Sequence, residues 1–181
     1  MAAIGRRVVV YGPSGSGKST LARALAERLA VPVVELDAIY HGRPGWDDLS
    51  RDEFREAVAA ILARETGGWV IEGNYGMVRD LILPLAETAV WLRLPFRTVY
   101  PRLVRRTIVR GLCHELLWGT NRESLRMAFF TRDSMLLWGI SHWRAGIRNT
   151  AADLARIPHH ARVIELRSPR AVRSFLEHAT P

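Results

Sequence analysis

The stretch VVVYGPSGSGKSTLARAL, residues 8–25, decides the fold of this 181-residue chain. The run Arg7–Tyr11 is β-branched and is ended by glycine, which is typical of a short buried strand. After the glycines, Leu21, Leu25 and Leu29 recur on one stripe, which predicts a helix from Gly17 to about Ala30. The stretch therefore predicts a buried strand, a tight glycine-rich loop and an amphipathic helix, in that order.

The glycine-rich loop itself carries a chemical prediction. Its sequence GPSGSGKS matches the Walker A pattern in every fixed position, and a glycine-rich turn arising by chance is the alternative. Glycines let consecutive N–H groups face phosphate oxygens, and the helix N-terminus adds partial positive charge. Lys18 is the chain's single lysine, as expected where a compact ammonium must reach the β- and γ-phosphates and a planar guanidinium would not fit. We expect ATP and Mg²⁺ to bind Gly12, Pro13, Ser14, Gly15, Ser16, Gly17, Lys18, Ser19 and Thr20, with the Ser19 hydroxyl at the metal.

Strands and helices alternate along the rest of the chain. Further buried strands are predicted at Val33–Leu36, Trp69–Glu72, Ala89–Leu94 and Arg162–Leu166. Ser50 and Glu53 form a capping box for one helix, and Ser168-Pro169 begins the last. Alternation of this kind predicts a parallel sheet covered on both faces, with ligands beyond the carboxyl ends of its strands. We therefore expect one three-layer α/β/α domain over 1–181, a five-stranded sheet of order 2-3-1-4-5, and a helical lid.

Composition and charge bound the class of protein. The 48% hydrophobic content and mean hydropathy of −0.02 suit a globular chain, no apolar run is long enough for a membrane span, and the single cysteine, Cys113, fits a reducing cytoplasm. The net charge is +8, and residues 93–148 hold eleven arginines against three acids, which accounts for all of it. A genome rich in G and C explains the choice of arginine, but not its clustering, which suits polyphosphates or a nucleic-acid backbone.

Other P-loop classes fit less well. A guanine-reading Asn-Lys-x-Asp would need a second lysine, and the third strand ends WVIEGNY and not in the Asp-Glu of motor-type ATPases. The segments GPSGSGKST, VVELDAIYHGRPGW, WVIEGNYG, VWLRLP, GTNRESLR and ELRSPRAVRSFL resemble the adenylate kinase and shikimate kinase branch of P-loop kinases. Within that branch, the chain most resembles the bacterial group called DNA topology modulation protein, or adenylate-kinase-related protein.

The resemblance assigns roles to acids after the second strand. It implies that Asp37 orients or deprotonates the acceptor hydroxyl, and that Glu35 serves Mg²⁺ through water, with Asp37 also near the metal. Phosphoryl transfer depends mainly on positioning and charge stabilisation, so one acid and one metal suffice. A role of Asp37 in capping the next turn is the alternative.

The resemblance also assigns roles to basic residues between the fourth and fifth strands, in a lid segment of about 97–155. Arg102 would stack on adenine and Arg106 would contact phosphate; a spacing of four puts both on one helical face, although a solvated basic face is the alternative. Arg122 and Arg126 would contact the migrating phosphoryl group as catalytic residues. Arg132 is a weaker candidate for the same role. Arg167, Ser168 and Pro169 would form the rim of the adenine site. Pro101 predicts that the first helix of this segment begins near Thr98.

The acceptor segment, about 37–67, departs from adenylate kinases because it is short and has one clear helix. Glu72-Gly73-Asn74-Tyr75 with Arg79 replaces their Asp-Gly-Phe-Pro-Arg pattern. We expect an acceptor pocket that holds a polar, and in one interpretation anionic, molecule. Its candidate residues are Asp37, Tyr40, His41, Arg43, Trp46, Asn74, Tyr75 and Arg79, each of which has an ordinary loop role as its alternative.

These observations predict an ATP- and Mg²⁺-dependent phosphotransferase that acts on a small hydroxylated or phosphorylated acceptor. One alternative is a nucleoside monophosphate kinase. A second is an ATP-binding regulatory protein that contacts DNA through its basic segment, which we favour less because no DNA-binding motif is legible. The sequence leaves the acceptor and the oligomeric state open.

Overall fold

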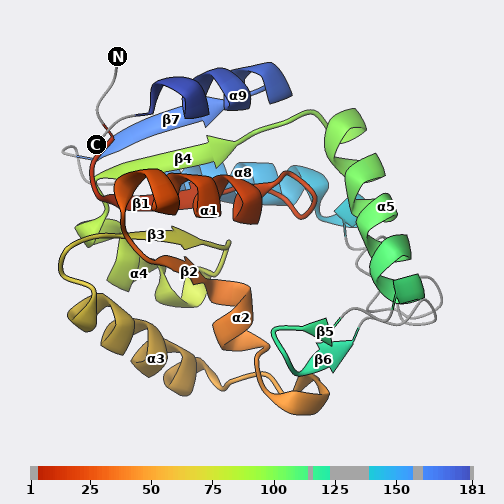
Figure 1. Ribbon diagram of the computed structural model, residues 1–181, viewed down its shortest axis with the longest axis horizontal. Helices are drawn as coiled ribbons and strands as arrows, with labels where there is room; N and C mark the ends of the chain where they lie inside the picture. Colours follow the sequence, from red (N-terminus) through yellow and green to blue (C-terminus); the bar gives the residue numbers. More distant parts are fainter. Residues whose placement is uncertain (1–3, 114–115, 123–138, 157–160, 180–181) are drawn as a thin grey trace.

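A computed structural model describes residues 4–113, 116–122, 139–156 and 161–179, with the side chain of Arg122 excepted. Its central sheet has five parallel strands in the order β2-β3-β1-β4-β7. These strands are β1 (Arg7–Tyr11), β2 (Val33–Glu35), β3 (Trp69–Glu72), β4 (Thr88–Leu92) and β7 (Arg162–Leu166). The predicted fifth strand is β7, because two short strands that the sequence analysis did not anticipate precede it. The predicted α/β/α fold class is confirmed (Figure 1).

Helices cover both faces of this sheet. They are α1 (Lys18–Leu29), α2 (Leu36–Tyr40), α3 (Arg51–Arg64), α4 (Arg79–Ile82), α5 (Phe96–Cys113), α8 (Trp143–Leu154) and α9 (Pro169–His178). Short 3₁₀ turns are η1 (Pro44–Trp46), η2 (Gly76–Val78) and η3 (Leu83–Leu85). One buried cluster joins the sheet to α1 and α9, and a second joins the opposite face to α3, α4 and α8. The nearly continuous apolar strands fit a sheet that is buried on both sides.

Local signals set the ends of several helices. Helix α3 begins at the predicted capping box: Ser50 Oγ accepts from the Glu53 amide at 3.3 Å, and Glu53 Oε2 accepts from the Ser50 amide at 2.9 Å. The hydrogen bond from Ser50, followed by that from Arg43, lowers the pKa of Glu53 to about 2. In α9 the Ser168 hydroxyl accepts from the Ala171 amide at 3.1 Å. Both helix starts were predicted correctly.

Helix α5 corrects one predicted boundary. The helix begins at Phe96 and not near Thr98, so Pro101 lies inside it. Proline removes the N–H that would have bonded the carbonyl of Arg97, four residues earlier. Because Arg97 is exposed, water can satisfy that carbonyl.

The segment between β4 and β7 is not wholly helical, which corrects the prediction of a helical lid. Strands β5 (Leu116–Leu117) and β6 (Asn121–Arg122) form an antiparallel hairpin, here called the lid hairpin. Its turn has positive φ at Trp118 (49°) and Gly119 (79°), and the Thr120 amide donates to the Leu117 carbonyl at 3.0 Å. Two positive φ values suit a type I′ turn, which glycine favours. No described helix is long and apolar enough to cross a membrane.

Candidate active site

The glycine-rich loop lies at the carboxyl edge of the sheet, between β1 and α1 (Figure 1). Gly15 has φ +86°, and a Cβ there would lie 2.8 Å from the carbonyl oxygen of Val99 in α5. A side chain at this position would therefore push the loop away from α5. The Ser16 hydroxyl is buried and makes no hydrogen bond in the described structure. The loop thus keeps a polar group available for a ligand, as a phosphate cradle requires.

Helix α1 and strand β3 meet beside this loop. Lys18 is the first residue of α1, and the Ser19 hydroxyl donates to Glu72 Oε1 at 2.8 Å. Glu72 is only 2% exposed, and its Oε2 has no hydrogen-bond partner among the described residues. Burial raises the pKa of Glu72, while the charge of Lys18 and the Ser19 hydrogen bond oppose that rise. The carboxylate is held here against its desolvation cost, which is common at functional sites.

Sequence analysis missed Glu72 as a functional residue. An acid after an apolar strand is a weak signal alone, but in the sheet Glu72 pairs in register with Val10 of β1, one residue before the end of that strand. The hydroxyl oxygen of Ser19 and the unpartnered carboxylate oxygen of Glu72 are the hard oxygen donors that Mg²⁺ prefers. Among described residues no group of three or more His, Cys, Asp and Glu side chains forms a metal cluster. The site therefore fits a Mg²⁺ that is held jointly by few protein oxygens and by phosphates, and not an all-protein cage.

The two acids predicted after the second strand have different surroundings. Glu35 Oε1 accepts from Arg23 Nε at 2.9 Å and from Nη2 at 2.5 Å, so this carboxylate is largely committed to an ion pair. Asp37 lies in the first turn of α2, and its carboxylate is a neighbour of the Tyr75 hydroxyl. Burial, and then the charge of Asp37, raises the pKa of Tyr75 above its ordinary value. Tyr75 therefore stays protonated beside Asp37.

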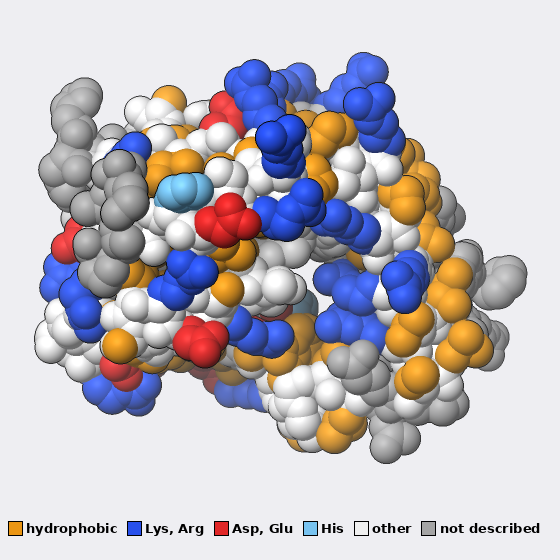
Figure 2. Space-filling model, turned by 45° about the horizontal axis from the view of Figure 1, so that its top comes forward, with side chains coloured by type: hydrophobic (Ala, Val, Ile, Leu, Met, Phe, Trp, Pro, Cys, Tyr) orange, Lys and Arg blue, Asp and Glu red, His pale blue; other side chains and the backbone are white. Residues whose placement is uncertain are grey.

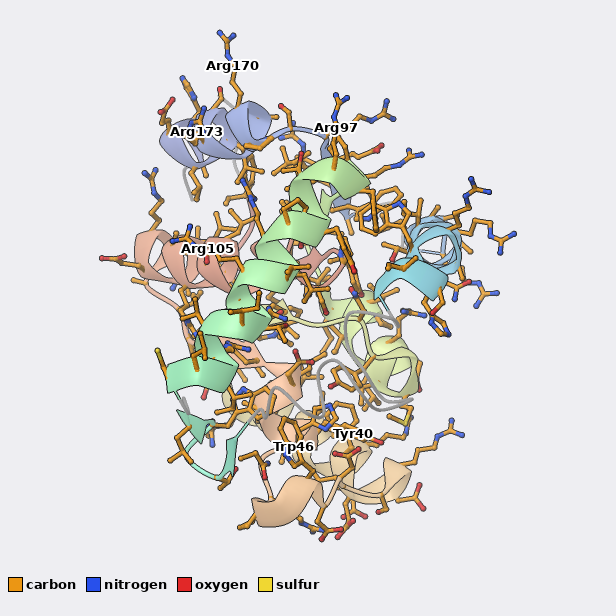
Figure 3. The ribbon with its side chains drawn as sticks, turned by 90° about the vertical axis from the view of Figure 1, so that its right-hand side faces the viewer. Tyr40, Trp46, Arg97, Arg105, Arg170 and Arg173 are labelled. Carbon is orange, nitrogen blue, oxygen red and sulfur yellow. The ribbon has the colours of Figure 1, made fainter. Side chains whose placement is uncertain are left out.

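Aromatic side chains cluster around Asp37 on the acceptor segment. Tyr40 contacts Phe54 and Tyr75 with ring centroids 5.1 and 5.2 Å apart, and His41 stacks on Trp118 of the lid hairpin at 5.8 Å. Figure 3 shows Tyr40 and Trp46 together on this lower part of the molecule. We call these rings, Tyr40, His41, Trp46, Phe54, Tyr75 and Trp118, the aromatic cluster. The predicted acceptor residues Tyr40, Trp46 and Tyr75 are thus brought together.

Asn121 fastens the lid hairpin to the acceptor segment. Its Nδ2 donates to the carbonyls of His41 and Arg43 at 2.7 and 2.8 Å. Its Oδ1 accepts from the Trp46 amide at 3.0 Å, and the residue is 2% exposed. Every partner is main chain, so the contact defines where β6, and with it the backbone of Arg122, lies relative to residues 41–46. Apart from the quoted segment GTNRESLR, sequence analysis had no signal for this contact.

Three other predicted acceptor residues have structural partners. Asn74 Oδ1 accepts from the Gly12 amide at 3.3 Å, and its Nδ2 donates to the Gly12 carbonyl at 2.7 Å, which fixes the start of the phosphate loop. Arg79 Nη1 forms an ion pair with Asp153 Oδ1 of α8 at 2.6 Å. The guanidinium of Arg79 also lies near Tyr11, whose pKa is nevertheless raised to about 12 because burial outweighs the effect of that charge. Arg43 pairs with Glu53 at 2.7 Å.

The predicted nucleotide-site residues on the basic segment are only partly assembled. Arg102 is exposed and Arg106 half-buried on α5, next to Leu103, whose backbone lies close to Gly15. Arg167 is paired with Glu165 at 2.9 Å, Ser168 caps α9, and Pro169 is the first residue of that helix. The resemblance assigns backbone contacts with adenine to these residues, and that role stays a prediction. Arg126 and Arg132 lie outside the described residues, as does the side chain of Arg122.

The basic surface around the site is visible in two views. Figure 2 shows a hollow bordered by Lys and Arg side chains. Figure 3 shows Arg97 on α5 and Arg170 on α9 projecting outward. Arg97, Arg105, Arg170 and Arg173 are all exposed, and none forms an ion pair within the described part of the chain. The hollow suits a phosphorylated ligand, and the outward arginines form a separate basic surface.

The parallel sheet, its glycine-rich loop at the carboxyl edge and the Lys18–Ser19–Glu72 arrangement define a P-loop fold. The chain belongs to the AAA domain family, whose model matches residues 8–109, and to the shikimate kinase-like branch of P-loop kinases. It is 34% identical over 116 residues to a shikimate kinase of Nitratidesulfovibrio vulgaris, covering 55% of this chain and 63% of that protein. It is 31% identical over 134 residues to a shikimate kinase of Paramagnetospirillum magneticum, covering 67% of each. The chain thus spans about two thirds of the length of these relatives.

Solved structures agree on the fold. Shikimate kinase from Acinetobacter baumannii in complex with shikimate superposes with a TM-score of 0.56 at 17% identity, covering 95% of this chain and 89% of that one. A gluconokinase from Sinorhizobium meliloti 1021 superposes with a TM-score of 0.51 at 20% identity, covering 97% and 94%. At this level of identity, the likeness shows the fold and leaves the acceptor open.

Proposed function

We propose that the protein transfers the γ-phosphoryl group of ATP to a small hydroxylated or phosphorylated acceptor. The observation that carries this proposal is the meeting of Lys18, Ser19 and the buried Glu72 beside a complete phosphate loop. The shikimate kinases and the gluconokinase among its relatives are named for phosphorylation of small molecules, which supports the same reaction class. A cytoplasmic location, suggested by the single cysteine, is part of this proposal.

The reaction balances with groups that this chain supplies. The acceptor oxygen forms a bond to the γ-phosphorus, the bond from phosphorus to the β–γ bridging oxygen breaks, and ADP leaves with that oxygen. The Asp37 carboxylate receives the proton of the acceptor hydroxyl, and the neighbouring protonated Tyr75 would orient that carboxylate by donating to it. Lys18 and the loop amides stabilise charge on the phosphates. Mg²⁺, held through Ser19 and Glu72, would neutralise further phosphate charge.

Coupled release of ADP tests this function. The assay uses MgATP and a panel of sugars, cyclic polyols, shikimate, nucleosides and nucleoside monophosphates. We expect acceptor-dependent ADP release that Lys18→Ala and Asp37→Asn each reduce by about 100-fold or more, with the exposed loop variant Asp47→Asn as a matched control. Turnover that no acceptor stimulates, or that Asp37→Asn leaves unchanged, would overturn the proposal.

The two alternatives have their own assays. Strong inhibition by a dinucleotide that joins adenosine to a nucleoside monophosphate through phosphates would identify a nucleoside monophosphate kinase. DNA binding is favoured by four exposed arginines that form no ion pair with other described residues: Arg97, Arg105, Arg170 and Arg173. It predicts an affinity that falls linearly, in logarithms, with salt concentration. Membership of the DNA topology modulation protein group remains a prediction from the quoted segments.

A further inference from the structure

A pocket of about 500 Å³ lies between α5, α8 and the carboxyl edge of the sheet. Its volume falls in the range of roughly 300–1,000 Å³ that is usual for sites of small ligands. Pro13 and Ser14 of the phosphate loop contribute to its wall, as does Asn74, which holds the start of that loop. A molecule in this pocket would therefore lie directly beside the phosphate cradle. We call this space the α8 pocket.

An ion pair in the wall of the α8 pocket has two unused hydrogen-bonding atoms. Arg79 and Asp153 both line the pocket and are joined at 2.6 Å, with side-chain exposures of 22% and 9%. Arg79 Nε and Asp153 Oδ2 are buried and have no hydrogen-bond partner in the part of the chain that the structure describes. One is a donor and the other an acceptor, while the two charges cancel. A hydroxyl group, which both donates and accepts, is the complement of this pair.

Aromatic side chains form much of the remaining wall. Trp91, Phe96, Tyr100 and Trp143 all line the pocket. Phe96 stacks on Tyr100 with centroids 4.9 Å apart and meets Trp143 edge to face at 5.1 Å, so these rings are held by one another. Aromatic walls favour a flat or ring-shaped ligand with an apolar face. The rings offer no compensation for a ligand's negative charge, and the other guanidinium in the wall, that of Arg156, is exposed, so that water screens its charge.

The pocket is distinct from the aromatic cluster but adjoins it. Of the predicted acceptor residues, Asn74 and Arg79 line the α8 pocket, whereas Tyr40, Trp46 and Tyr75 belong to the aromatic cluster. Arg79 and Tyr75 both line a cavity of about 10 Å³ between the two regions. Arg79 therefore lies both in the wall of the α8 pocket and beside Tyr75, the neighbour of Asp37.

We propose that the α8 pocket binds an uncharged ring compound that carries hydroxyl groups, and that this compound is the phosphoryl acceptor. The second part rests on the proposed phosphotransferase function. The closed Arg79–Asp153 pair makes Arg79 a poor receptor for a carboxylate or phosphate, because binding an anion would leave the buried Asp153 uncompensated. The proposed acceptor is therefore not an anion. It differs in this from shikimate, which is bound in the structure of one structural neighbour.

Direct binding tests the pocket without relying on catalysis. Calorimetry on the full chain uses two matched pairs of probes: uridine with uridine 5′-monophosphate, and myo-inositol with quinate. We expect at least one uncharged probe to bind about tenfold or more tightly than its anionic counterpart. Thr150→Trp, which adds bulk at a residue lining the pocket, should abolish that binding. Arg148→Ala, at an exposed residue of the same helix that does not line the pocket, is the control and should leave it unchanged.

The second readout is a change in the preference between uncharged and anionic probes. Asp153→Asn keeps the side-chain shape but leaves the Arg79 charge uncancelled, so preference should shift by about tenfold or more toward the anionic probe of each pair. Circular dichroism verifies that each variant is folded. Failure of every uncharged probe to bind, binding that Thr150→Trp does not affect, or equal affinity for both members of each pair overturns the assignment.

The same probes separate this inference from the proposed function. If uncharged probes bind in the pocket but release no ADP from MgATP, the binding site stands and the phosphotransferase assignment fails. If acceptors release ADP while Thr150→Trp and Asp153→Asn change neither rate nor preference, phosphoryl transfer stands and the assignment of the α8 pocket fails.

Discussion

The Ser19 hydroxyl donates a 2.8 Å hydrogen bond to Glu72 Oε1 and so joins the first turn of α1 to the end of β3. The contact brings together one residue of the phosphate loop motif and one acid that lies more than fifty positions later in the chain. The other oxygen of Glu72 is buried and has no hydrogen-bond partner among the described residues. Ser19 and Glu72 therefore supply the oxygen atoms of the site that best suit a cation.

Glu72→Gln should lower activity and raise the free energy of unfolding. The amide can still accept from Ser19, but it removes the charge that would serve Mg²⁺, so Mg²⁺-dependent release of ADP should fall by about 10- to 100-fold. Burial raises the pKa of Glu72 in the folded state, so the folded protein binds more protons than the unfolded chain just above pH 4.5, and its stability falls as pH rises through that window. The variant should gain on the order of 1 kcal/mol in unfolding free energy at pH 7, and less near pH 5.

Denaturant unfolding at both pH values, together with the ADP assay, measures the two effects of Glu72→Gln. Glu56→Gln removes an exposed carboxylate from α3 and should change neither. A loss of stability at pH 7 would show that the charge of Lys18 outweighs the desolvation of Glu72, contrary to our interpretation.

Tyr75→Phe should impair catalysis and spare nucleotide binding. The phenyl ring keeps the packing against Tyr40 and Phe54 at 5.2 and 5.1 Å, but the hydroxyl that orients Asp37 is lost. We expect kcat to fall about tenfold or more with an unchanged KM for ATP. Because burial raises the pKa of Tyr75 above its ordinary value of about 10, ionisation of this hydroxyl should not reduce wild-type kcat between about pH 8 and about pH 10. A rise in KM alone would contradict a role at Asp37.

Tyr11→Phe should flatten the alkaline loss of stability. Burial raises the pKa of Tyr11 from 10.0 to about 12, so the unfolded chain releases this proton before the folded protein does. Stability is therefore lost as pH rises from about 10 to about 12, by on the order of 2 kcal/mol for this group. The variant should start lower, because Arg79 loses a polar neighbour, and then lose less than the wild type over that window. Chemical unfolding measured at several alkaline pH values checks this, with Tyr100→Phe as control; parallel curves for wild type and Tyr11→Phe would refute it.

Local chemistry accounts for what sequence analysis predicted well. Three features depend only on residues that are neighbours in the sequence, so their patterns can be recognised there. They are the strand before Gly12, the capping box at Ser50 and the Ser168 cap. The role of Glu72 depends on β3 lying beside β1, and that of Asp153 on α8 reaching Arg79 from 74 positions away. Such partners are set by tertiary packing, which composition and periodicity do not encode. The predicted start of α5 was wrong because a helix can continue through Pro101 when water hydrogen-bonds the carbonyl four residues earlier, which belongs to the exposed Arg97.

Asn121→Ala should release the lid hairpin from the acceptor segment. The substitution leaves the carbonyls of His41 and Arg43 and the amide of Trp46 without their partner, which should cost about 1–3 kcal/mol of stability. Hydrogen exchange of the Trp46 amide, followed by NMR, should accelerate by about tenfold or more, because this amide donates to Asn121 Oδ1. Asn121→Asp is the matched control: it keeps an acceptor for that amide but cannot donate to either carbonyl, so Trp46 should stay better protected than in the alanine variant. Since Arg122 follows Asn121 on β6, release of the hairpin should also lower kcat more than it raises the KM for ATP. Unchanged exchange at Trp46 in Asn121→Ala would show that the stacking of His41 on Trp118, and not Asn121, fastens the hairpin.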